Sequence, residues 1–154
     1  SRGLGDVYKR QDKGFLSEED AARARVDELN TFARSELFKQ IRSSSEIHRE
    51  FRFNVKLSAA DFTKDESLKE LLHGRELLVQ GVIDCIFRDR NGALIIIDYK
   101  TDRVRGEETA ERAQTYSKQL EAYAYAAQRM TGKPVRECVL YFLYSGETVK
   151  SSCK

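Results

Sequence analysis

Residues 81–100 read Gly81-Val-Ile-Asp84-Cys-Ile-Phe-Arg-Asp-Arg-Asn91-Gly92-Ala-Leu-Ile-Ile-Ile-Asp98-Tyr99-Lys100, which is an apolar strand, a turn and a second apolar strand. Asn91-Gly92 is the strongest short-range hairpin signal that a sequence offers. The run 93–97 is apolar at every position, which predicts a central strand covered on both faces. Unpaired charges beside a buried strand are costly, so a strand rarely ends in Asp98-Tyr99-Lys100 without a reason.

The chemistry of this ending follows from Asp84 and Asp98. They lie on strands joined by a tight turn, so a suitable hairpin register lets both carboxylates converge on one ion. Such hard oxygen ligands suit Mg²⁺ or Mn²⁺, and the carbonyl of Tyr99 is a further oxygen at the strand edge. Lys100 points to the same face as Asp98, where its ammonium is able to orient an attacking water. This set indicates metal-assisted hydrolysis of a phosphodiester. A solvated strand end, in which Asp98, Lys100 and Asp102 form a surface ion pair, is the alternative.

Length and composition describe a single compact globular domain. The chain has 154 residues, of which 40% are hydrophobic and 34% charged, and this excludes a disordered chain. A net charge of +2 neither supports nor excludes DNA as a partner. No apolar run approaches the length of a membrane span. Cys85, Cys138 and Cys153 are dispersed, which argues against a disulfide framework or a zinc or iron–sulfur site and favours a reducing, cytoplasmic setting.

Patterning along the rest of the chain predicts further helices and strands. Ser17 and Asp20 have capping-box spacing, which predicts a helix from Ser17. Periodicity and turn residues predict a helix over 31–42, strands over 50–57, 77–87, 93–99 and 135–144, a loop with a helical turn over 59–74, a charged loop over 103–109 and a helix over 111–130. A crossover helix before the last strand predicts that this strand is parallel to one of the others.

Three motifs stand out along the chain, namely Gly81-x-x-Asp84, Asp98-Tyr99-Lys100-Thr101-Asp102 and Tyr116-x-x-Gln119-Leu120-x-x-Tyr123. Together they resemble the RecB-type branch of the PD-(D/E)XK nuclease superfamily, and within it the C-terminal nuclease domains of AddA-type helicase–nucleases. The resemblance covers residues 14–144. It implies a nuclease domain over 14–154, and the segment 1–13 is expected to be irregular or foreign to the domain.

This resemblance implies an α/β fold of the three-layer restriction-endonuclease-like type, with a mixed central sheet flanked by helices. The implied activity is Mg²⁺- or Mn²⁺-dependent cleavage of DNA by an ATP-dependent helicase–nuclease in double-strand-break repair and recombination. The resemblance assigns metal ligation to Asp84, Asp98 and the Tyr99 carbonyl, and the catalytic lysine role to Lys100. It assigns DNA binding or active-site support to Gln119, Tyr116 and Tyr123. A packing face is the alternative for that helix, and a catalytically silent DNA-binding or scaffold module is the alternative for the whole domain.

Two departures from the family pattern bear on the metal site. RecB-type nucleases usually carry a metal-binding histidine on a helix upstream of the first strand, and neither His48 nor His73 matches that context. The chain therefore looks like a domain that lacks its first helix. The four cysteines of the AddB-type iron–sulfur cluster are absent, so no cluster is expected. Glu50, near the first strand, is expected to pair with Arg49 or Arg52.

The same resemblance implies the partners. The expected substrate is DNA, as single strands from unwound duplex ends. A helicase motor is expected in the same full-length chain, and an AddB-like protein is the expected second component of the complex; no membrane partner is expected. The sequence has no P-loop, so no nucleotide site is expected within it.

Overall fold

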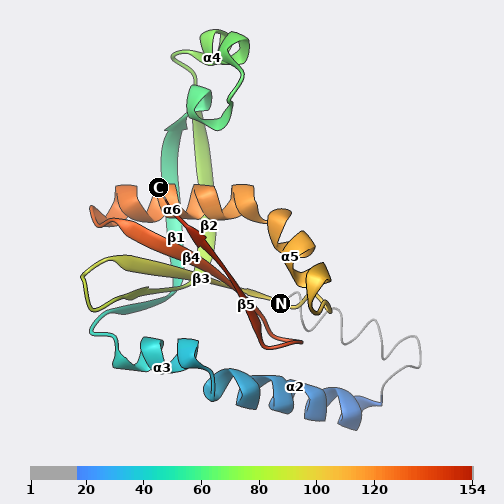
Figure 1. Cartoon of the computed structure of the whole chain (residues 1–154). Coiled ribbons are helices and arrows are strands. Elements are labelled where there is room, and N and C mark those ends of the chain that lie inside the picture. Colours follow the sequence, from blue (N-terminus) through green and yellow to red (C-terminus); the bar gives the residue numbers. More distant parts are fainter. Residues whose placement is uncertain (1–16, 154) are drawn as a thin grey trace.

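A mixed five-stranded sheet forms the middle layer of the computed structural model, which describes residues 17–153 (Figure 1). Its strands, in their order across the sheet, are β1 (Ile47–Ser58), β2 (Glu76–Arg88), β3 (Leu94–Lys100), β4 (Val135–Phe142) and β5 (Glu147–Ser152). β3 and β4 are parallel, and the other neighbours are antiparallel. The predicted parallel strand is confirmed, whereas β5 was not predicted. The expected irregular segment 1–13 lies outside the described residues.

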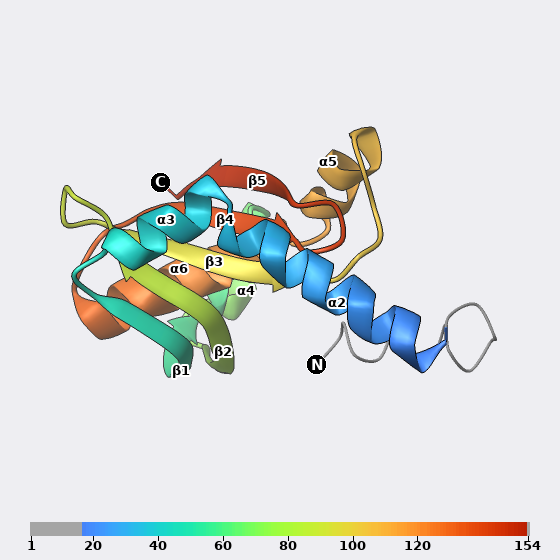
Figure 2. The same ribbon diagram turned by 90° about the horizontal axis from the view of Figure 1, so that it is seen from below.

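Helices cover both faces of the sheet, as Figures 1 and 2 show. They are α6 (Ser117–Thr131) on one face, α2 (Glu18–Ala33) and α3 (Glu36–Ser43) on the other, and α5 (Glu107–Gln114) beside β5. The short turn η1 (Ala59–Phe62) and α4 (Glu66–Leu72) cap the long β1–β2 hairpin, which projects from the body (Figure 1). This arrangement confirms the expected three-layer α/β fold. No helix in the described part of the chain is long and apolar enough to cross a membrane.

β3 runs through the centre of the sheet and is covered on both faces, as predicted. Its residues 94–97 are each at most 2% exposed. Ile96 packs in the core on the α6 side, and Ile97 packs in the core on the side of α2 and α3. Successive residues of a strand face opposite sides. Asp98 and Lys100 therefore share the α6 side with Ile96, and Tyr99 lies on the other side.

The predicted helix over 31–42 is wrong in its bounds, because a serine cap interrupts it. α2 ends at Ala33 and α3 begins at Glu36. Ser35 is the N-cap of α3, and its Oγ accepts a hydrogen bond from the Phe38 N–H at 3.1 Å. The cap at the start of α2 is confirmed, because Ser17 Oγ accepts from the Asp20 N–H at 3.1 Å.

The predicted loop over 103–109 and helix over 111–130 are also wrong in their bounds. α5 begins inside the expected loop and ends at Gln114, and Tyr116 is the N-cap of α6. Thr115 Oγ1 donates to the Arg112 carbonyl at 2.7 Å, a local bond of the kind that competes with helix continuation. The predicted C-terminal end is confirmed, because Gly132 caps α6 with a left-handed φ of 69°.

Two of the three cysteines meet although they lie far apart in the sequence. The Sγ atoms of Cys138 in β4 and Cys153 after β5 are 2.8 Å apart, and both thiols are free. Cys85 is buried in the core on the α3 side. The antiparallel pairing of β4 with β5 brings Cys138 and Cys153 together. Since β5 was not predicted, the sequence did not indicate this contact.

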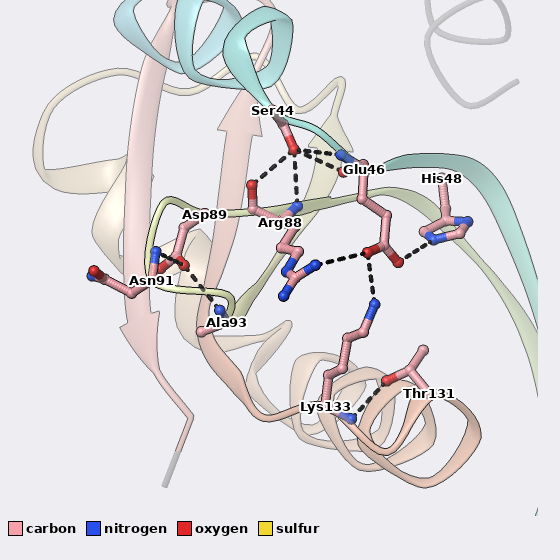
Figure 3. Close-up of polar contacts among 9 residues, drawn as sticks. All are labelled: Ser44, Glu46, His48, Arg88, Asp89, Asn91, Ala93, Thr131 and Lys133. Carbon is pink, nitrogen blue, oxygen red and sulfur yellow. Dashed lines mark hydrogen bonds and ion pairs between the residues drawn. The ribbon is translucent and has the colours of Figure 1, made fainter.

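Glu46 joins several segments at the opposite end of β3 from Lys100 (Figure 3). Its Oε2 accepts from Lys133 Nζ at 2.6 Å, and its Oε1 lies 2.9 Å from His48 Nε2. Nearby, Ser44 Oγ donates to the Arg88 carbonyl at 2.8 Å. The hydrogen bond from Lys133, followed by that from His48, lowers the pKa of Glu46 to about 2. An ionised Glu46 therefore links the start of β1 to the connection between α6 and β4.

We expect the substitution Glu46→Gln to destabilise the fold by about 1 kcal/mol at pH 7. Because the folded pKa lies below the ordinary 4.5, the stabilisation is fully present above pH 4.5 and is lost as the pH falls toward 2. Urea unfolding at pH 7 and pH 3 measures this, and the difference from wild type should shrink at pH 3. Glu36→Gln removes an exposed ion pair with Lys39 and is the matched control, with a smaller expected effect. A difference that stays constant with pH would contradict the assignment.

Candidate active site

Asp84 and Asp98 lie opposite each other at the end of the β2–β3 pairing. Cys85 pairs with Ile97, so the antiparallel register makes Asp84 and Asp98 the next opposed residues. The backbone N–H of Tyr99 donates to Asp84 Oδ2 at 2.9 Å, which orients the Asp84 carboxylate beside the end of β3. The structure thus brings together two carboxylates that the sequence placed on neighbouring strands without fixing their register.

The strand geometry is irregular at this point. Ile83 packs on the α6 side and Cys85 on the opposite side, although residues two apart on a regular strand share a face. Across the pairing, Glu50 lies opposite Asp84, since its neighbours pair with Cys85 and Ile83. Glu50 has a φ of 51°, a left-handed conformation that is rare for a non-glycine residue. Such backbone strain clusters at functional sites, where the surrounding structure enforces it.

Asp98 and Lys100 form a buried ion pair at the end of β3. Each residue is only 5% exposed, and Lys100 Nζ lies 2.7 Å from Asp98 Oδ2. Burial raises the pKa of Asp98 to about 6; Lys100 opposes this rise and the nearby Asp84 adds to it. The buried Asp98 Oδ2 has no hydrogen-bond partner besides this ammonium, so one of its two acceptor positions is unused. The alternative of a solvated surface pair is therefore wrong for Asp98 and Lys100.

The first turns of α6 hold the ammonium of Lys100. It donates to Gln119 Oε1 at 2.9 Å and lies over the ring of Tyr116, 3.8 Å from the centroid. Gln119 Nε2 in turn donates to Tyr123 OH at 3.0 Å. The helix motif therefore meets the lysine through Gln119 and Tyr116. Tyr123 also packs edge-on against Phe53, with centroids 5.7 Å apart, so it belongs partly to the core.

Asp102 ties this group to α5, a link that the sequence reasoning missed. Tyr116 OH donates to Asp102 Oδ2 at 2.8 Å, and Arg112 Nη1 lies 3.2 Å from Asp102 Oδ1. Asp102 thereby orients the ring that covers Lys100. Its position at the end of the motif 98–102 was the only signal in the sequence for this role.

One open cleft of about 760 Å³ is lined by Asp84, Asp98, Lys100, Asp102, Gln119 and Tyr123. Apolar walls come from Phe32 of α2 and Leu143 after β4, and β1 contributes Arg49 and Glu50. No ion pair joins Glu50 to Arg49 or Arg52 within residues 17–153, so the expected structural pairing is wrong. Glu50 instead lines the cleft together with the carboxylates of Asp84, Asp98 and Asp102.

The donor set of the cleft fits a small, hard cation. Asp84 and Asp98 converge, and the buried Asp98 Oδ2 has an unused acceptor position. The described residues contain no group of three or more His, Cys, Asp or Glu side chains that is able to hold a metal. A protein contribution of two carboxylates suits Mg²⁺, which retains several waters. His48 contacts Glu46 and His73 ends α4, so neither histidine lines the cleft.

Comparisons with known proteins agree with this geometry. The family model described as the PD-(D/E)XK nuclease superfamily matches residues 5–152. An ATP-dependent helicase/nuclease subunit of Thermoanaerobacter sp. (strain X514) is 34% identical over 139 residues, which are 90% of this chain. The protein of the same name from Alkaliphilus metalliredigens (strain QYMF) is 37% identical over 138 residues, or 88% of this chain. The chain spans 11% of the length of each of these relatives. It is thus similar to one segment of much longer proteins, and it belongs to the PD-(D/E)XK nuclease superfamily.

Proposed function

We propose that this chain is the metal-dependent deoxyribonuclease domain of an ATP-dependent helicase–nuclease that acts in double-strand-break repair and recombination. The observation that carries this proposal is the buried Asp98–Lys100 pair, which faces Asp84 in one cleft. Charges are costly in a core, so a fold without a use for them would replace them with apolar residues. Membership of the nuclease superfamily supports the cleavage chemistry. The helicase/nuclease names of the relatives support the helicase association.

Asp84, Asp98 and the carbonyl of Tyr99 are the proposed ligands of Mg²⁺ or Mn²⁺. When bound, such a cation polarises the phosphate and lowers the pKa of a coordinated water. The Tyr99 N–H keeps the Asp84 carboxylate turned toward the end of β3. The central position of β3 holds Asp98 rigidly, because both faces of the strand are packed.

Lys100 orients the attacking water and offsets the negative charge that develops on the phosphate. Its ammonium is already held by Gln119 and by the Tyr116 ring, so little reorganisation is needed when substrate arrives. Asp102 keeps the Tyr116 ring in position through its hydrogen bond. In this proposal Gln119, Tyr116 and Tyr123 support the active site by fixing the lysine.

The proposed substrate is DNA, as single strands from unwound duplex ends. The proposed motor belongs to the same full-length polypeptide, and an AddB-like protein is the proposed second component of the complex. The support for this setting is that the chain matches 11% of the length of relatives named as helicase/nuclease subunits. A silent DNA-binding or scaffold module would need no converging Asp84, Asp98 and Lys100, and no observation favours it.

Removing either charge of the buried pair should slow cleavage strongly. We expect Asp98→Asn and Lys100→Met each to slow cleavage of single-stranded DNA by about 100-fold or more, because each acts on the charge of the scissile phosphate. A labelled oligonucleotide, Mg²⁺ and the helicase–nuclease polypeptide that carries this chain provide the assay. Asp61→Asn and Lys39→Met alter exposed side chains outside the cleft and serve as matched controls. Equal cleavage rates in the wild type, the two active-site variants and the two controls would contradict the catalytic assignment.

Metal binding separates the nuclease from the silent module. Calorimetric titration of the chain with Mn²⁺ should detect a site that is lost in Asp84→Asn and in Asp98→Asn. The site should persist in Lys100→Met, because lysine supplies no ligand to the cation. Binding that ignores both aspartates, or no binding at all, would favour the silent module instead.

Gln119 tests the support role of the helix. We expect Gln119→Ala to lower kcat roughly tenfold to 100-fold with little change in unfolding temperature, because the lysine loses its positioning partner. Tyr123→Phe removes only the hydroxyl that accepts from Gln119, so its effect on kcat should be smaller. Steady-state cleavage and thermal unfolding are measured on the same samples. If Gln119 only packs the helix against the sheet, stability will fall while kcat stays at the wild-type value.

A further inference from the structure

Two arginines and one tyrosine meet beside the cleft. Arg103 and Arg105 lie on the loop after β3, and Tyr144 lies in the turn after β4. The Cζ atoms of Arg103 and Arg105 are 4.8 Å and 4.6 Å from the centroid of the Tyr144 ring. A guanidinium group stacks favourably on an aromatic ring, so a single ring holds both side chains.

The parallel pairing of β3 with β4 places this group at the site. Lys100 pairs with Phe142, and the Leu143 N–H donates to the Lys100 carbonyl at 2.9 Å. The segments that leave the two strands therefore start from the same edge of the sheet, where Figures 1 and 2 show both of them next to α5. Ligands of α/β folds bind at this carboxyl edge of parallel strands. Leu143 lines the cleft, and Tyr144 follows it directly.

The two guanidinium charges have no ion-pair partner within 4 Å among residues 17–153. Glu28 and Glu147 are near enough for the arginine charges to affect the pKa values of their carboxyl groups. Burial raises the pKa of Glu28, and Arg103 opposes that rise. A hydrogen bond from the Thr109 hydroxyl, with others, lowers the pKa of Glu147, and Arg105 adds to the lowering. Glu147 is thus already engaged at the start of α5, and two like charges remain together at the rim of the cleft.

We propose that Arg103 and Arg105, held on the Tyr144 ring, bind phosphates of the same DNA strand that is cut in the cleft; this inference rests on the proposed nuclease function. The planar donor fork of arginine matches the oxygens of a phosphate. Stacking on the ring orders both long side chains in advance, which reduces the entropy lost on binding. Such contacts position a strand without reading its sequence.

The test is the affinity of the chain for a fluorescent oligothymidylate, measured by anisotropy in EDTA so that no cleavage occurs. The double variant Arg103→Ala/Arg105→Ala should bind about tenfold more weakly. The slope of log K against log salt should fall by about 1.4, because each phosphate contact of a single strand contributes about 0.7. Circular dichroism and thermal unfolding confirm that each variant is folded.

Substitutions at Tyr144 test whether DNA binding requires that the ring hold both arginines in place, or only that the two positive charges be present. Tyr144→Leu keeps both charges but removes the ring, and it should weaken binding by about threefold or more. Tyr144→Phe keeps the ring and should bind within about twofold of wild type. The matched control is Arg90→Ala/Arg129→Ala, which removes two exposed arginines at the far ends of β3 and α6 and should bind like wild type.

The proposal is overturned if the double variant binds like wild type, if the control variant loses as much affinity, or if Tyr144→Leu has no effect. These outcomes are independent of the cleavage assay. Arginine- and Tyr144-dependent binding without Mg²⁺-dependent cleavage would retain the strand contact and reject the nuclease proposal. If the chain cleaves DNA but the double variant binds like wild type, the nuclease proposal is retained and the strand contact is rejected.

Discussion

The candidate active site depends on one contact, the 2.7 Å pairing of Lys100 with Asp98 inside the sheet. Two charges at the end of a central strand are tolerated only when they are paired and further satisfied. The fold meets this demand through α6, from which Gln119 accepts a hydrogen bond and Tyr116 covers the ammonium. Burial raises the pKa of Asp98, and its contact with the Lys100 ammonium opposes this rise.

Two departures from regular secondary structure shape the cleft. The interruption at Thr115 makes Tyr116 the N-cap of α6, from which its ring reaches Lys100 and its hydroxyl reaches Asp102. Glu50 has a left-handed backbone conformation and lies opposite Asp84. At this point the side chains of β2 no longer alternate regularly between the two faces of the sheet. Both irregularities occur at the site, and the left-handed φ of Glu50 costs conformational energy, which is the pattern expected when function constrains a backbone.

Strong contiguous signals predicted the elements that lie nearest the chemistry. The hairpin of residues 81–100, the buried β3 and the helix caps at Ser17 and Gly132 were all readable from local patterns. Prediction failed where local preferences competed, as at Ser35 and Thr115, where a side-chain hydrogen bond outweighs helix propensity. It also missed β5, whose residues are mostly exposed and polar and which is a strand because it pairs with β4.

The residues of the candidate site could be proposed from the sequence, because few side chains are able to bind a hard cation or steady a phosphate. Residue type and spacing pointed to Asp84, Asp98 and Lys100, and the family resemblance added Gln119. Their convergence was not readable, and neither were the role of Asp102 and the meeting of two arginines on Tyr144. Contacts between distant residues depend on strand register and on the parallel pairing of β3 with β4. These are set by the packing of the complete sheet between its helices, and no local stretch of chain encodes them.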